Sequence, residues 1–378
     1  SWIIDGTLAN IAWAPSLVSY NLSWEKIRTW NAGVDFGLFN NRLTGSFDYY
    51  IRKTDDMVGP SEKLPVVLGT AVPSSNNTNL KTFGWELELM WKDRLNNGLN
   101  YSARFTLADS RTKITRYSNP SGLIDGFYAG KYVGEIWGYE TIGIAQSDQE
   151  MAEHIGRLIN GGQSNLGQDW KAGDIMYKDL NEDGKIDAGS RTLQDHGDLK
   201  RIGNSTPRYN VGLELAADWK GFDIRMFWQG TLKRDYFQGS YYFWGANGRQ
   251  GPWFSTALKG HDDYFRNDEA SPLGTNLNSY YPRPLFNTDK NQQSQTKYLQ
   301  DASYLRLKNL QIGYSLPHNI VQKMGMQHLR IFASGENLFT ITSLIDFFDP
   351  ESIEGGSWGH GNVYPLSRTF SFGLNVTF

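Results

Sequence analysis

The feature that most constrains this chain is a strict alternation of apolar and polar residues, which is clearest at its end. Over residues 367–378, every second position is apolar and the positions between are Ser, Gly, Asn and Thr; the apolar set is Phe370, Phe372, Leu374, Val376 and Phe378. Side chains of a β-strand point alternately to opposite faces, so this period predicts a strand with one apolar and one polar face.

The same alternation recurs along the sequence and predicts an all-β chain. It indicates nine strands, near 23–39, 42–58, 83–95, 100–117, 208–220, 222–237, 302–316, 327–343 and 367–378. In the segment near 302–316, Leu305 and Leu307 are out of phase with Leu310, Ile312 and Tyr314. We therefore predict a β-bulge between these two groups.

The connections between the predicted strands alternate in length. Tight turns at 40–41, 96–98 and 220–221 alternate with long loops near 59–82, 118–207, 238–301 and 344–366. This sorting is typical of outer-membrane barrels and unusual for a soluble sandwich, so we predict a transmembrane antiparallel β-barrel with long extracellular loops. A helical membrane protein is excluded, because no apolar run approaches the ~20 residues of a spanning helix. Nine is odd, whereas closed bacterial barrels normally have even strand numbers, so residues 1–378 are expected to be the C-terminal portion of a larger barrel.

Composition excludes several classes of function. Lys and Arg number 37 against 40 Asp and Glu, and the net charge of −3 offers no basic surface for nucleic acid. There is no Cys, and therefore no disulfide or catalytic thiol. No H-E-x-x-H or Walker A motif occurs, so an enzyme is not expected. The opening residues SWIIDGTLAN contain no targeting signal, as expected of a mature end or an internal cut.

One polar segment matches the first nine positions of a calcium-binding loop. Its candidate ligands are oxygen atoms at alternating positions, those of Asp179, Asn181, Asp183 and Asp187 and the carbonyl of Lys185. Gly184 permits the sharp turn, but Ser190 stands at position twelve, where such loops carry Glu. The affinity for Ca²⁺ should therefore fall, unless a nearby carboxylate such as Asp195 substitutes. A structural Ca²⁺ site is one interpretation, and a polar turn closed by Asn/Asp-Gly chemistry is the other.

Aromatic residues gather in the long loops. Such side chains stack on sugar rings, grip peptide side chains or anchor protein interfaces, and they also form the internal core of a loop. The candidates for substrate or partner contact are Trp137, Tyr139, Tyr241, Tyr242, Phe243, Trp244, Trp253, Phe254 and Trp358.

Several motifs, in order along the chain, resemble the C-terminal barrel of SusC/RagA-type TonB-dependent transporters of Bacteroidetes. They are WEKIRTWNAGVD (24–35), FDYYIRKTDDM (47–57), GDIMYKDLNEDGKID (173–187), IGNSTPRY (202–209), ENLFT (336–340) and DPE (349–351), with Phe378 as an aromatic C-terminus. The resemblance implies a bacterial outer-membrane barrel of about 22 strands. It also implies a plug and a TonB box, neither of which is in this chain, and a SusD-like surface lipoprotein, with a dimer of transporter–lipoprotein pairs as one arrangement.

Three functions follow as hypotheses. The first, implied by the resemblance, is TonB-dependent import of a large glycan or peptide together with the lipoprotein. The second is a passive outer-membrane pore or a barrel-based surface adhesin. The third is a soluble, calcium-braced β-protein that binds glycans.

Overall fold

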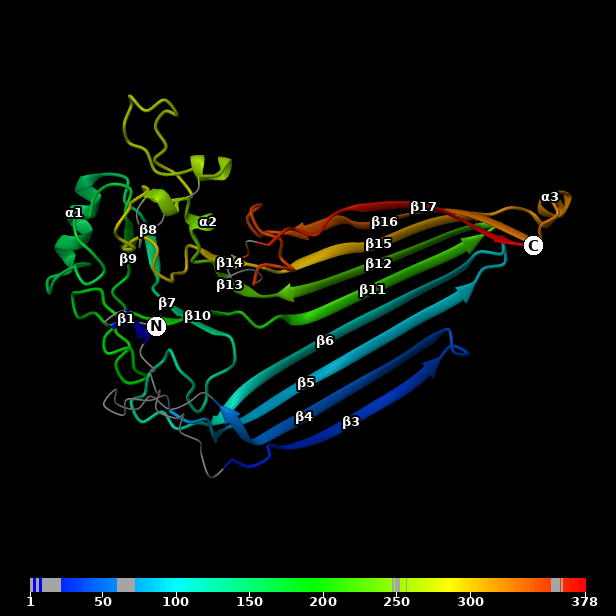
Figure 1. The fold of residues 1–378 in the computed structure, drawn as a ribbon, viewed down its shortest axis with the longest axis horizontal. Coiled ribbons are helices and arrows are strands. Elements are labelled where there is room, and N and C mark those ends of the chain that lie inside the picture. The colour runs from blue at the N-terminus through cyan, green and yellow to red at the C-terminus, as the bar shows by residue number, and fades with distance from the viewer. Residues whose placement is uncertain are drawn as a thin grey trace.

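The main element of the structure is one nine-stranded antiparallel sheet. The computed structural model describes residues 22–59, 72–246, 248, 252–255, 257–354, 361 and 363–378, and the paired strands β1 (Ile3–Ile4) and β2 (Thr7–Leu8). The sheet strands pair in chain order, and they are β3 (Lys26–Leu38), β4 (Leu43–Gly59), β5 (Ser75–Arg94), β6 (Asn100–Arg116), β11 (Arg208–Trp219), β12 (Phe222–Lys233), β15 (Tyr304–Ser315), β16 (His328–Thr342) and β17 (Thr369–Thr377) (Figure 1). All nine segments predicted from the alternation form strands of this sheet.

Tight turns lie at one end of the sheet and long loops at the other (Figure 1). Lys220 and Gly221 both have positive φ, 49° and 87°, as the central residues of a type I′ hairpin turn require. The link between β15 and β16, at the same end, carries the short helix α3 (His318–Lys323). In the described part of the chain, no helix has the length and apolar character to cross a membrane.

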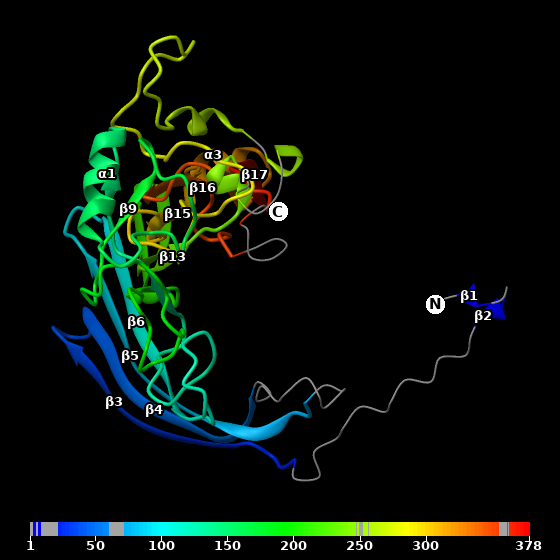
Figure 2. The ribbon, with the colours of Figure 1, turned by 90° about the vertical axis from the view of Figure 1, so that its left-hand side faces the viewer.

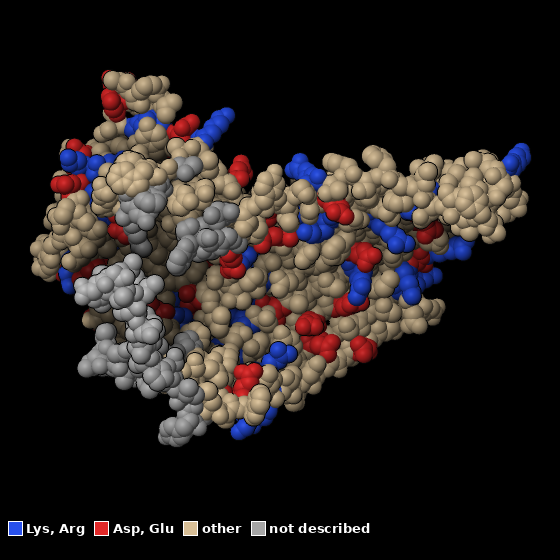
Figure 3. All heavy atoms as spheres, in the orientation of Figure 1, with Lys and Arg blue, Asp and Glu red and all other residues tan. Residues whose placement is uncertain are grey.

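The sheet curves into an arc (Figure 2). Its two faces differ in polarity. The apolar side chains of the alternating pattern are exposed on one face; Phe372 is 85 % exposed, for example, and Trp30 58 %. The other face carries interspersed acidic and basic side chains, which Figure 3 shows along the concave side. An apolar outside and a polar inside are the arrangement of a transmembrane barrel wall, as the sequence predicted.

The predicted bulge is present in β15. Trp228 of β12 pairs with Leu307 and Phe227 pairs with Asn309, so Lys308 is skipped in the ladder. The extra residue restores the phase, because it places Leu307 on the same face as Ile312.

The boundaries of two long loops differ from those predicted. β5 begins at Ser75, so the predicted 59–82 loop is too long; Met57 still pairs with Thr78, and Gly59 with Ser75. Residues 75–82 are mostly polar, so their strand has no alternation to reveal it. The 238–301 loop is closed at its base by pairing of β13 (Asp235–Phe237) with β14 (Leu299–Asp301).

The long loops fold together at the end of the sheet opposite the tight turns. We call the described parts of residues 117–207, 234–303 and 343–354 the cap. Its remaining elements are β7 (Glu135–Gly138), β8 (Thr141–Ile144), α1 (Asp148–Arg157), β9 (Ile175–Tyr177), β10 (Lys200–Asn204), α2 (Tyr241–Trp244), η2 (Pro252–Phe254) and η3 (Lys259–Asp262). β7 pairs with β10, and β8 with β9. The main buried hydrophobic cluster lies in the cap.

Candidate functional site

The cap is built around a cluster of aromatic rings from its two largest loops. Phe243 and Trp244 of α2 pack edge-to-face with ring centroids 5.0 Å apart, and Trp244 lies 4.7 Å from the ring of Tyr298. Tyr139 lies 5.4 Å from Tyr177 in the same core. Aromatic pairs in these geometries add favourable interactions to the burial of their apolar area. The cluster therefore gives the loops a folded core of their own.

A buried carboxylate joins these two loops electrostatically. Asp174, which is fully buried, accepts hydrogen bonds from both Arg283 Nε and Arg283 Nη2 at 2.7 Å. It also lies 2.9 Å from Lys290 Nζ and accepts a hydrogen bond from Asn291 Nδ2 at 2.9 Å. Burial raises the pKa of Asp174, but its hydrogen bonds from Arg283, Asn291 and Lys290 outweigh burial and hold the pKa below the ordinary value. The carboxylate is thus charged and fixes the loops' relative position.

The third cap segment is fastened to the sheet through the bulged strand. Arg306 Nη2 lies 2.7 Å from Asp349 and Arg306 Nη1 2.8 Å from Glu351, and Arg306 is only 3 % exposed. Lys308, the bulge residue, lies 3.0 Å from Glu351. Arg234 at the end of β12 makes a 2.7 Å ion pair with Glu354. The DPE motif therefore anchors this segment on the strand ends.

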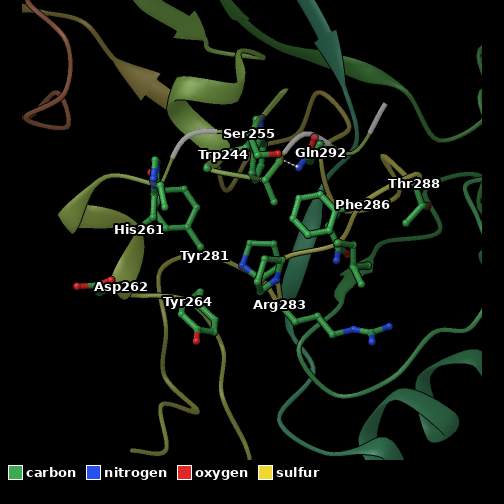
Figure 4. Close-up of a pocket in the computed structure, with 17 residues that line it drawn as sticks. Trp244, Ser255, His261, Asp262, Tyr264, Tyr281, Arg283, Phe286, Thr288 and Gln292 are labelled. Carbon is green, nitrogen blue, oxygen red and sulfur yellow. Dashed lines mark hydrogen bonds between the residues drawn. The ribbon is translucent and has the colours of Figure 1, made fainter. Parts of the chain in front are cut away.

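Two of the cavities lined by described residues lie in the cap and have aromatic walls. One, of about 300 Å³, is mainly apolar and lies between α2, η3 and residues 281–292; Figure 4 shows Trp244, Tyr264, Tyr281 and Phe286 around it. The other, of about 420 Å³, is more polar, and its lining includes Asp125, Glu135, Trp137, Tyr139 and Arg191. Pockets with aromatic walls and a few polar groups are the usual form of binding sites for small ligands or parts of larger ones.

His261 lines the first cavity but has a structural role. Its Nδ1 accepts a hydrogen bond from the Leu258 backbone N–H at 2.9 Å, and its Nε2 lies 2.9 Å from the Tyr242 carbonyl oxygen, to which it donates. Burial lowers the pKa of His261. The ring is therefore a neutral hydrogen-bonding link between η3 and α2.

The aromatic residues predicted as contacts are distributed between core and surface. Trp137 and Tyr139 line the polar cavity, Trp244 lines the apolar one, and Trp253 is 80 % exposed. Tyr241 and Tyr242 are half-buried, with ring centroids 4.4 Å apart.

Three other predicted contacts are not supported or not described. Phe243 is fully buried in the aromatic cluster, so its predicted contact role is wrong; the ring stabilises the loop instead. The side chain of Phe254 and the whole of Trp358 lie outside the described residues.

In the calcium-like loop, the carboxylates accept hydrogen bonds from the loop itself. Asp179 accepts from the backbone N–H groups of Glu182 at 2.7 Å and Gly184 at 2.8 Å. The Lys185 ammonium lies 2.6 Å from Asp187 and 3.7 Å from Asp183. Among the described residues, no three acidic or His side chains converge closely enough to hold a metal ion in this conformation. The Ca²⁺ site stays a prediction.

Sequence reasoning missed the charged residues that organise the cap. Asp198, fully buried, accepts from the backbone N–H groups of Leu180 at 2.7 Å and Asp187 at 2.8 Å and so ties down the calcium-like loop. Burial raises its pKa. Asp174 and its partners Arg283 and Lys290 were also missed. A lone Asp or Lys in a long loop carries no local signal, because its partner is more than a hundred residues away.

A curved antiparallel sheet with an apolar outside, a polar inside and a folded cap of long loops at one end defines part of a transmembrane outer-membrane-type barrel. The chain belongs to the family described as TonB dependent receptor-like, beta-barrel, whose model matches residues 6–338. This confirms the resemblance found in the sequence. The family comprises receptors and transporters and is not a class of enzymes.

Individual relatives agree with this assignment. The chain is 29 % identical over 380 residues to the TonB-dependent receptor P3 of Formosa agariphila, covering 95 % of this chain and 34 % of the relative. It is 27 % identical over 373 residues to the TonB-dependent receptor SusC of Bacteroides thetaiotaomicron, covering 96 % and 33 %. The solved structure of the RagAB peptide transporter shares the fold, with a TM-score of 0.66 and 24 % identity over 94 % of this chain and 36 % of that one. The chain thus spans about a third of the length of these relatives.

Proposed function

We propose that this chain forms part of a transporter that imports a large nutrient across the bacterial outer membrane, coupled to TonB. The observation that carries the proposal is the folded cap at one mouth of a polar-lined barrel wall (Figure 1). Passive barrels need long loops only to narrow a channel, whereas this cap has its own core and its own cavities. Ordering so many residues costs conformational entropy, which favours a functional role for the cap.

The polar concave face supports passage of a hydrated solute. Arg104 lies between Glu88 and Glu214 on adjacent strands, with a bidentate contact to Glu88 at 2.8 and 3.0 Å. This side chain is about half exposed, so water reaches the charged ladder. A barrel interior of this kind is suited to polar cargo or to a polar domain within the lumen.

The proposal includes a SusD-like lipoprotein that covers the cap. A hairpin at the cap's outer edge is held at its base by reciprocal backbone hydrogen bonds between Arg266 and Asn276, of 3.1 and 2.7 Å. It exposes Leu273, and Trp253 is exposed elsewhere on the cap. Exposed apolar anchors among charged residues are what a specific protein interface uses. The RagAB importer, which shares the fold, has been described in open–open and closed–closed states, which supports a complex that opens and closes.

The substrate class we propose is an oligosaccharide or an oligopeptide. The RagAB peptide transporter among the solved structures supports the peptide class. The oligosaccharide class rests on the resemblance found in the sequence. The two cavities differ in polarity, and the polar one, with Trp137 beside a charged Asp125–Arg191 pair, suits a hydroxyl-rich or amide-rich ligand.

The test is uptake by cells that carry the complete gene. Labelled oligosaccharide and oligopeptide mixtures are offered to wild-type cells, to a deletion strain and to the complemented strain. We expect uptake of one class to be lost on deletion and abolished by a protonophore, because TonB-coupled import needs the inner-membrane proton gradient. Uptake that persists at full rate with the protonophore would indicate a passive pore, and unchanged uptake on deletion would contradict the proposal.

A further inference from the structure

A row of cations crosses four neighbouring strands on the outer face of the sheet. In the strand register, Arg28 of β3 is opposite Lys53 of β4, Lys53 is opposite Lys81 of β5, and Lys81 is opposite Lys113 of β6. The register is continuous from these positions into the apolar part of each strand. The row therefore lies on the same face as Trp30, because side chains two residues apart share a face.

The position of the row along the strands is at the membrane boundary. The next row on the same face, nearer the tight turns, consists of Trp30, Ile51, Phe83 and Arg111, again in direct register. Aromatic side chains at this level are typical of the boundary between hydrocarbon and headgroups. Because the cap and long loops lie beyond the cationic row, the row is on the extracellular side, at the level of the outer-leaflet headgroups.

The acidic residues near the row are engaged by cations other than Lys53, Lys81 and Lys113. Asp55 forms an ion pair with Arg28, and Asp56 lies 2.9 Å from Arg116 and 3.8 Å from Lys26.

Within the described part of the chain, Lys53, Lys81 and Lys113 have no carboxylate partner. The Lys113 ammonium and the Arg111 guanidinium lie over the ring of Tyr132, at 5.6 and 4.2 Å from its centroid. Like charges directly opposite each other on adjacent strands, about 4.8 Å apart, repel and destabilise the pairing. A multivalent anion would remove that cost.

We propose that Lys53, Lys81 and Lys113, flanked by Arg28 and Arg111, bind the phosphate groups of an anionic lipid in the outer leaflet. Phosphate oxygens accept strong charge-assisted hydrogen bonds from Lys and Arg. A lipid fits better than a soluble anion because Trp30, Ile51 and Phe83 lie directly below the row on β3, β4 and β5 and would contact its acyl chains. Long Lys side chains at the edge of the hydrocarbon reach toward headgroups in the same way.

The test uses the full-length transporter that contains this chain, purified in detergent and placed in phosphatidylcholine nanodiscs with a small fraction of a bis-phosphorylated lipid A. Phosphorylated lipid retained per transporter is counted by native mass spectrometry. The variant is Lys53→Gln/Lys81→Gln/Lys113→Gln. The matched control, Lys92→Gln/Lys220→Gln/Lys323→Gln, removes the same charge at the tight-turn end. Folding of each variant is checked by heat-modifiable migration on a gel.

We expect the row variant to lose retention by more than about tenfold, because each Lys near an anionic lipid surface changes affinity by about fivefold. The control should retain lipid as the wild type does. Retention should also fall with rising salt and when the same lipid is dephosphorylated. Equal retention by both variants would overturn the proposal, and so would full displacement by millimolar inorganic phosphate, which would indicate a soluble-anion site. If the Gln variant fails to fold, the Lys→Arg triple variant must retain the lipid, and its loss of lipid would overturn the proposal.

Discussion

The carboxylate of Asp174 is a buried charged link between the two large cap loops. Replacing it by Asn would leave the Lys290 ammonium buried without its counter-charge. Removing one partner of a buried ion pair costs about 3–5 kcal/mol. We therefore expect Asp174→Asn in the full-length transporter to open the cap and expose its 257–298 segment to cleavage, as measured by limited proteolysis with mass spectrometry.

The Asp125–Arg191 pair is a matched control for that variant. It is also bidentate, with distances of 2.8 and 2.9 Å, but both side chains are about half exposed. Exposed pairs contribute less than about 1 kcal/mol. Asp125→Asn should therefore leave the protection unchanged. Equal cleavage in both variants would show that the buried pair does not hold the cap.

Low pH should weaken the same link between the two cap loops. The pKa of Asp174 is lower in the folded cap than the ordinary value of about 3.9 for an unfolded Asp. Its contribution to stability is therefore complete above that value and is lost as the pH falls through the lower, folded pKa. Protease protection of the wild-type cap should be constant from pH 7 to about pH 5 and decline below about pH 4. Asp174→Asn should lack this acid-dependent component.

Calcium binding at the loop of Asp179, Asn181, Asp183, Lys185 and Asp187 is a separate prediction. The ion would take the place of the Lys185 ammonium, which now lies beside Asp183 and Asp187. Millimolar Ca²⁺ should raise the unfolding temperature of the cap relative to a chelator, and Asp183→Asn/Asp187→Asn should abolish the difference. An identical unfolding temperature with calcium and with chelator would leave the segment as a polar turn.

At the scale of elements, each strand of the barrel wall could be predicted because lipid and lumen impose opposite polarities on alternate residues. The bulge at Lys308 was predictable for the same reason, since an inserted residue changes the phase of the apolar positions. The first part of β5 was not predictable, because its residues between Ser75 and Thr82 are polar except Leu80 and show no alternation. Backbone pairing with β4 maintains that part of the strand. Because backbone hydrogen bonds do not require particular side chains, this pairing cannot be recognised in the sequence.

The interior of the cap could not be predicted from local sequence. Its strands have three to five residues, too short for a period to be read. Its stability comes from contacts between distant segments, such as Asp174 with Arg283. Aromatic enrichment identified the right loops but did not separate Phe243, which is in the core, from Trp253, which is exposed.

The two faces of β17 should respond very differently to a new charge. Leu374 is 65 % exposed on the outer face, whereas Ser371 faces the lumen opposite Ser334 of β16. An Arg on the lipid face near the bilayer midplane costs about 2–4 kcal/mol. Leu374→Arg should therefore lower the free energy of unfolding in liposomes by that amount, measured by urea titration, and Ser371→Arg by much less. Similar losses for both would argue against lipid contact at Leu374.

At the scale of the whole molecule, removing the hairpin at the outer edge of the cap tests whether the proposed lipoprotein binds there. Residues 267–275 can be replaced by a short Gly-Ser turn without disturbing the base, because Arg266 and Asn276 are already bonded to each other. We expect the deletion to reduce co-purification of the lipoprotein and to lower uptake, while heat-modifiable migration stays normal. Full co-purification with normal uptake would mean that the hairpin has no part in the interface.

The odd number of strands in the described sheet has a consequence for assembling a barrel from separate fragments. In an antiparallel sheet of nine strands, the two edge strands, β3 and β17, run in the same direction. They cannot form the antiparallel hydrogen bonds that the rest of the sheet uses. The nine strands therefore cannot close on themselves into a small non-native barrel. The edges of the sheet would instead stay receptive to a complementary piece with an odd number of strands. This sheet is therefore suited to fragment complementation. In such an assay, two separately produced polypeptides associate, and the formation of one complete barrel is the signal.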